Sequence, residues 1–329
     1  MRSALLQLPG NPFILRYWLR NYEAVWKGEV DELRVFVNGN PRADQVQAMR
    51  RLVQDTGGIF TAQEGRLVHG QATRILIGET EATDVLLIED DAFVRQPGAI
   101  DRAFVDAECG AVVGSPRGGM DPAIEQAARD KWGPDPEGPD GSSGYGLWPC
   151  FMFGPRHVLD EVKDGFSSQS WPAGQVIPGL GCWFGFETHT DTTTSSAFRL
   201  REAGIPLVYE GQWKELWMKD LSAMQEKAGY DPPWFHSGGL SNENLYLVTE
   251  VPEGAFGVRP NIGGTLEGTD WAHRIWWWRR CIETAPDDFF PEVGGHILNQ
   301  LLTLENYCNV FEDVDRWEQM LPAWITWEE

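Results

Sequence analysis

Short apolar segments alternate with amphipathic segments along the first two thirds of the chain. The apolar segments, which predict strands, are residues 3–8, 32–37, 58–61, 84–88, 111–114, 148–153 and 205–209. Apolar residues recur at helical spacing over residues 12–26, 43–54, 68–79 and 99–107, and a helix is predicted to end near residue 203. Strands that alternate with helices predict an α/β fold with a mainly parallel, doubly wound, Rossmann-like sheet.

This prediction indicates where a ligand would bind. In open parallel sheets, ligands lie beyond the carboxyl ends of the strands. The predicted strands place residues 9–11, 38–40 and 89–91 there. These three segments are therefore the first candidates for a functional site.

The acidic run Glu89-Asp90-Asp91 follows directly on the apolar strand. Neighbouring like charges are costly unless a cation neutralises them. Mg²⁺ and Mn²⁺ accept carboxylate ligands and keep positions free for phosphate oxygens. The run therefore predicts a divalent metal site, with a solvated turn after a core strand as the alternative.

This acidic run, followed by Pro97-Gly98 and a helix, resembles the Asp-x-Asp segment of GT-A glycosyltransferases, with Glu in the first place. The resemblance extends over residues 3–239 and is nearest to the inverting, family-2-like enzymes. It implies that Asp91 binds the metal and that Glu89, with Asp90 beside it, lies near the ribose and sugar of a nucleotide-sugar donor. By position in the family's order, the other donor-binding candidates are Pro9, Gly10, Asn11, Asn38, His69 and Arg74. Asn38 stands where the family usually has Asp, and Arg74 reads equally well as a surface arginine.

The resemblance also implies a catalytic base and a second metal ligand. Inverting transfer needs a carboxylate that accepts the proton of the acceptor hydroxyl. Asp191 and Glu187 are the candidates, and the distance to Arg199 favours Asp191. Acids that cap a helix N-terminus are the alternative reading of both. His236, after an aromatic segment, resembles the late metal-binding histidine of the family, although a lone histidine is more often an ordinary residue.

Composition limits the partners. The formal net charge is −22, which opposes binding to phosphate backbones and anionic lipid at long range. The five cysteines are odd in number and far apart, which predicts reduced thiols and a cytoplasmic protein. No run approaches the ~20 apolar residues of a membrane-spanning helix, so no membrane insertion is expected.

We expect a GT-A domain over residues 1–240, with a nucleotide-sugar half (1–115) and an acceptor half (116–240), and a mainly helical extension over residues 241–329. The Gly-rich residues 133–146 predict a lid. Trp148, Trp171 and Trp183 are candidates for stacking on a sugar.

The predicted activity is a Mn²⁺- or Mg²⁺-dependent sugar transfer, with a UDP-sugar favoured as donor. The acceptor stays open between a glycan, a small molecule and a hydroxymethylated DNA base of the kind modified in phages. The alternatives are a sugar-1-phosphate nucleotidyltransferase, which usually needs a basic loop that residues 9–12 lack, and a non-catalytic glycan-binding module.

Overall fold

A computed structural model describes residues 1–10, 12–39, 41, 43–65, 67–117, 120–136, 144–210 and 233–236. The predicted helical extension over residues 241–329 lies outside these residues, as do residues 137–143 of the predicted lid.

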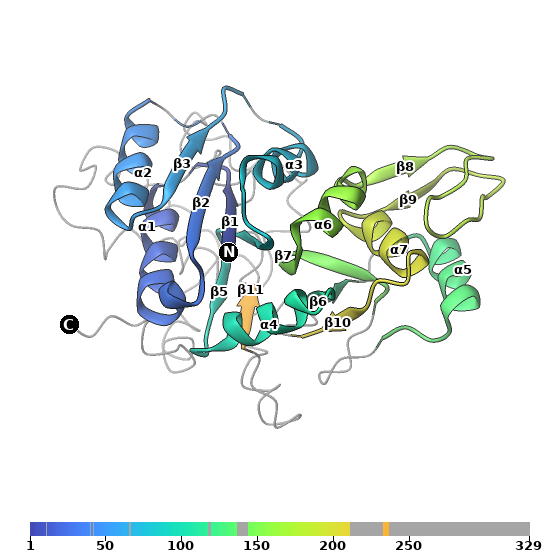
Figure 1. The fold of residues 1–329 in the computed structure, drawn as a ribbon. Helices are drawn as coiled ribbons and strands as arrows, with labels where there is room; N and C mark the ends of the chain where they lie inside the picture. The colour runs from blue at the N-terminus through green and yellow to red at the C-terminus, as the bar shows by residue number, and fades with distance from the viewer. Residues whose placement is uncertain are drawn as a thin grey trace, which may run out of the picture.

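A seven-stranded sheet forms the centre of the described structure (Figure 1). Its order is β10-β6-β7-β4-β1-β2-β3. The strands are β1 (Arg2–Leu8), β2 (Glu32–Val37), β3 (Ile59–Ala62), β4 (Asp84–Glu89), β6 (Val112–Arg117), β7 (Gly146–Pro155) and β10 (Leu207–Tyr209). Within this sheet only β7 runs antiparallel to its neighbours. The predicted α/β fold with a mainly parallel sheet is therefore confirmed.

Helices cover both faces of the sheet, as a doubly wound fold requires. Alternate side chains of β1 point to opposite faces: Leu6 and Leu8 belong to one buried cluster and Leu5 to another. The first cluster includes apolar residues of α1 (Pro12–Asn21), α2 (Ala43–Asp55) and α4 (Ala99–Glu108). The second includes those of α3 (His69–Glu79), α6 (Arg156–Val162) and α7 (Thr194–Glu202). In the described part of the chain, no helix has the length and apolar character needed to cross a membrane.

Two helices and three strands of the described structure were not predicted. They are β5 (Ala92–Val94), α5 (Pro122–Trp132), β8 (Gln169–Trp171) and β9 (Thr188–Thr190), together with α6. The amphipathic segment 12–26 is also not one α-helix, because it changes to a π-helix at Tyr22–Trp26. β5, β8 and β9 have three residues each, which is too few to show a period of two.

Strands from both predicted halves, residues 1–115 and 116–240, share the central sheet. β6 spans the predicted division at residue 115, and β11 (Trp234–His236) pairs with β5. Trp234 is fully buried, with its ring 5.1 Å from the ring of Phe151 in β7. The division into two halves stays a prediction.

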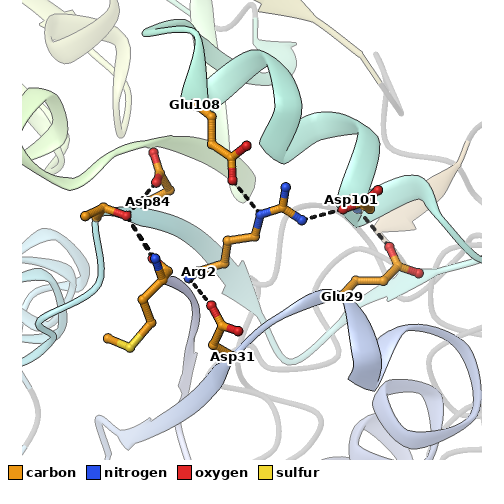
Figure 2. Close-up of polar contacts among 8 residues, drawn as sticks. Arg2, Glu29, Asp31, Asp84, Asp101 and Glu108 are labelled. Carbon is orange, nitrogen blue, oxygen red and sulfur yellow. Dashed lines mark hydrogen bonds and ion pairs between the residues drawn. The ribbon is translucent and has the colours of Figure 1, made fainter.

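An ionic network closes the amino-terminal edge of the sheet (Figure 2). Arg2, at the start of β1, binds Glu108 at 2.8 Å and also pairs with Asp101, so it ties β1 to both ends of α4. Glu29 accepts hydrogen bonds from the backbone N–H groups of Gly98 and Asp101, at 2.6 and 2.8 Å. The Glu29 carboxylate thus provides acceptors for N–H groups that have no partner within the helix at the start of α4, and its negative charge interacts favourably with the helix dipole. The opposite, carboxyl edge of the sheet carries the predicted site.

Candidate functional site

The carboxyl ends of β1, β2 and β4 lie side by side, as predicted. Leu8 is in register with Val37 of β2, and Gln7 is in register with Glu89 of β4. Gly10 has a φ of +123°, and a Cβ atom there would lie 2.9 Å from Cγ of Pro41. The turns after β1 and β2 therefore pack so closely that only glycine fits between them.

The acidic run occupies the turn between β4 and β5. Asp90 and Asp91 are buried, with 0% and 1% of their surface exposed, whereas Glu89 is partly exposed. Oε1 of Glu89 lies 2.9 Å from Nε2 of His69, at the start of α3. The structure thus brings together two residues that the sequence assigned separately to the donor site.

Helix α1 fixes the position of this turn. Trp18 Nε1 donates to the carbonyl of Ala92 at 3.0 Å. The buried Asn21 amide donates to the carbonyl of Val94 at 2.8 Å and accepts from the Val94 N–H at 3.0 Å. Side chains of α1 therefore hydrogen-bond to the backbone of alternate residues of β5, as a neighbouring strand would. They fix the position of the chain directly after Asp91.

The other edge of β5 pairs with β11. The register of this pair fixes how the backbones of the predicted metal ligands, Asp91 and His236, lie relative to each other. His236 lies opposite Ala92, the residue that follows Asp91. Directly opposed Cα atoms in an antiparallel pair are about 4.5–5.5 Å apart. The His236 side chain and Asn11 lie outside what the structure describes. Among the described residues, no group of three or more His, Cys, Asp or Glu side chains could hold a metal ion.

A small hollow lies beside Glu89 and His69. Its polar lining also includes Gln7, Thr73 and Thr193. Thr73 Oγ1 is 3.2 Å from Gln7 Oε1. The cavity volume is about 10 Å³, which is the space of about one water molecule. This hollow is therefore too small to be the donor pocket itself, and most of its lining is apolar, from residues such as Leu76 and Phe166.

Two predicted donor-binding residues have partners within the protein. The Asn38 amide donates to the Leu67 carbonyl at 3.1 Å and accepts from the Leu67 N–H at 2.8 Å. Arg74 pairs with Asp164, in the 3-10 turn at Lys163–Gly165, at 3.0 Å. The Asn38 contacts fasten the end of β2 to the segment before α3. Roles of both side chains in donor binding stay predictions.

The two candidate bases differ in how they are held. Asp191 is half-buried, and its Oδ1 accepts hydrogen bonds from Ser168 Oγ at 3.1 Å and from the Thr192 N–H at 2.6 Å. Glu187 is exposed, and its Oε1 lies 3.7 Å from Nε2 of His189. An oriented carboxylate suits a base better than a solvated one.

The segment after Asp191 reaches the hollow beside Glu89. Thr193 is buried, lines the hollow, and has a φ of +66°, which is rare for a β-branched residue. Its hydroxyl donates to the carbonyl of Leu147. Sequence reasoning missed Thr193, Gln7 and Thr73, because a threonine or glutamine carries no motif and is marked only by its neighbours in space.

Comparisons with known proteins concern the fold. No family model matches the chain, and no curated protein matches it. The chain is similar to glucosyl-3-phosphoglycerate synthase from Mycobacterium tuberculosis in complex with phosphoglyceric acid, at 17% identity and a TM-score of 0.38, over 70% of this chain and 81% of that one. The same enzyme with Mn²⁺, UDP and phosphoglyceric acid matches at 16% identity and a TM-score of 0.39, over 69% and 75% of the two chains.

A nucleotidyl transferase from Methanothermobacter thermautotroptrophicus matches at 11% identity and a TM-score of 0.37, over 63% of this chain and 85% of that one. Likeness of this degree establishes neither the activity nor the substrate of the chain.

Proposed function

We propose that this protein transfers a sugar from a nucleotide-sugar donor, with a UDP-sugar favoured, to an acceptor hydroxyl, and that it needs Mn²⁺ or Mg²⁺. The observation that carries the proposal is the register of β5 with β11. It brings His236 opposite the residue that follows Asp91, although the two are far apart in the sequence.

The chemistry of these residues fits a divalent cation. Burial of neighbouring carboxylates such as Asp90 and Asp91 is costly and favours compensation by positive charge. Carboxylate oxygen and neutral imidazole are both ligands of Mn²⁺, and carboxylate suits Mg²⁺. A cation bound there would neutralise the charge of a diphosphate leaving group.

The chain's own residues supply the remaining parts. Glu89, held by His69, lies at the strand end where a donor ribose or sugar would bind. Asp191 is the proposed general base, since two hydrogen bonds orient its carboxylate and its segment reaches the hollow beside Glu89. One base on the acceptor side corresponds to transfer with inversion.

Metal-dependent nucleotide binding tests the proposal most directly. We expect calorimetry to show UDP binding that requires Mn²⁺ or Mg²⁺, and we expect Asp91→Asn to abolish it while the circular dichroism spectrum is kept. Asp55→Asn, at the exposed end of α2, is the matched control and should bind as the wild type does. UDP binding that is equally strong with EDTA, or in Asp91→Asn, would refute the metal site.

Turnover assays then separate the activities. A panel of UDP-sugars should be hydrolysed slowly without acceptor, and Asp191→Asn should lower transfer by roughly 10²–10⁴ while UDP binding persists. Loss of activity in Glu187→Gln, with Asp191→Asn active, would assign the base to Glu187. Release of pyrophosphate from a nucleoside triphosphate and a sugar 1-phosphate would instead identify a nucleotidyltransferase.

A further inference from the structure

The loop between β8 and β9, residues 172–187, has a fixed backbone conformation. Ile177 and Leu180 are buried in a cluster with α5 and α7, and Lys131 Nζ donates to the Gly179 carbonyl at 2.6 Å. The loop also bonds to itself, through Gly174 N to Phe184 O at 2.8 Å, Ile177 N to Cys182 O at 2.9 Å and Gly181 N to Ile177 O at 2.9 Å.

This anchored loop nevertheless presents large apolar side chains to solvent. Trp183, Phe186 and Val176 are 61%, 54% and 51% exposed. The Phe186 ring is 5.8 Å from the ring of Phe184, and Phe184 packs against the buried cluster. Phe186 therefore lies against a side chain that is itself held by the core. Exposed aromatic side chains on a loop that is already held in place can bind a partner at little further ordering cost.

The loop is continuous with the proposed catalytic segment. It ends at the exposed Glu187 and leads into β9, where His189 is exposed, and then to Asp191. Phe186 precedes Asp191 by five residues, about 16 Å along an extended strand. In Figure 1, β8, β9 and their loop project away from β1 and β2. A molecule that contacts both Phe186 and Asp191 must therefore be extended.

The net charge of the protein limits which class of molecule can bind at this loop. The net charge of −22 opposes nucleic acids and anionic lipid surfaces. The carboxylate of Glu187 and the imidazole of His189 can bind hydroxyl groups beside the aromatic rings. Aromatic faces with a few polar groups beside them suit sugar rings, which have both apolar faces and hydroxyls.

We infer that Trp183 and Phe186 form a distal acceptor subsite that binds a neutral, extended oligosaccharide, whose end reaches Asp191. This inference rests on the proposed function, because it names the acceptor class of that activity. It also selects Trp183 among the three tryptophans considered for stacking, since Trp148 and Trp171 are buried.

Fluorine NMR of the full chain labelled with 5-fluorotryptophan tests the subsite without any activity. The Trp183 signal is assigned by its absence in Trp183→Phe. We expect cellulose-, starch- or chitin-derived oligosaccharides to shift this signal, and Trp183→Ala to weaken their binding by about 5- to 150-fold, the range for loss of one stacking contact. Trp183→Phe should retain most of the affinity, and Val105→Ala, another exposed apolar residue on α4, should retain all of it.

The outcomes separate this inference from the proposed function. If Mn²⁺-dependent UDP binding is present but no oligosaccharide shifts the Trp183 signal, the subsite is refuted and the transferase proposal stands. If oligosaccharides bind at Trp183 but UDP does not bind, the transferase proposal fails instead. A Trp183 signal shifted by single-stranded DNA or phosphatidylcholine vesicles, or a dimer that Trp183→Ala dissociates, would assign the surface to another partner and overturn the inference.

Discussion

Helix α3 offers two glycines at which the same substitution should have opposite effects. A Cβ atom on Gly70 would lie 2.6 Å from the backbone C atom of Phe166 and 2.6 Å from the backbone N atom of Ser167. Ordinary van der Waals contact begins at 3.4 Å, so Gly70→Ala requires α3 and residues 166–167 to move apart by 3.4 − 2.6 = 0.8 Å. Because the obstacle is backbone, no side-chain rotation relieves it. Gly78, by contrast, is exposed, and a Cβ atom added there would have nothing within 4 Å of it.

Overpacking of this kind costs about 1–3 kcal/mol, and alanine in a helix regains up to about 1 kcal/mol relative to glycine. We therefore expect Gly70→Ala to lower the free energy of unfolding by about 1–2 kcal/mol and Gly78→Ala to raise it by about 0.5–1 kcal/mol. Chemical denaturation followed by circular dichroism measures both.

The Gly70 variant should also disturb the site, since the neighbouring His69 binds Glu89. Hydrogen exchange of the peptides that cover residues 69–79 and 84–91 should rise in Gly70→Ala and stay unchanged in Gly78→Ala. If both variants changed stability in the same direction and by similar amounts, the close approach of α3 to residues 166–167 would not be a constraint on the fold.

Three further substitutions test single contacts. Asn21→Ala removes both hydrogen bonds to Val94 and should cost at least about 2 kcal/mol, since buried groups lose their partners; unchanged exchange of residues 92–94 would contradict this. Asn38→Asp keeps the acceptor for the Leu67 N–H but sets a carboxylate against the Leu67 carbonyl. It should therefore lower the free energy of unfolding by about 1–3 kcal/mol. An Asn38→Asp variant that unfolds at the same temperature as the wild type would refute this prediction. Burial raises the pKa of Glu32, but hydrogen bonds from an arginine, a serine and a threonine side chain outweigh it and hold that pKa below its usual value. The contacts of the Glu32 carboxylate therefore stabilise the fold above about pH 4.3, and this stabilisation is lost as pH falls through the folded-state pKa. Glu32→Gln should be less stable than the wild type at pH 7 and should lose less stability on acidification. Denaturation at a series of pH values would show both effects.

The apolar pattern alone was sufficient to predict the main elements and the edge where the candidate site lies. The strands β1, β2 and β4 and the helices α2 and α3 were predicted to within one or two residues, because each buries a face whose period shows in the apolar positions. Their alternation was enough to predict a mainly parallel sheet, and hence that residues 9–11, 38–40 and 89–91 follow its carboxyl ends.

Which side chains meet at that edge depends instead on the packing of distant segments. The pairing of His69 with Glu89, the Asn21 amide on Val94 and the position of His236 opposite Ala92 all join residues far apart in sequence. β5 and β11 have three residues each, so their place depends on partners contributed by α1 and by each other. Such contacts arise from packing across the sheet, and periodicity along one segment contains no information about them.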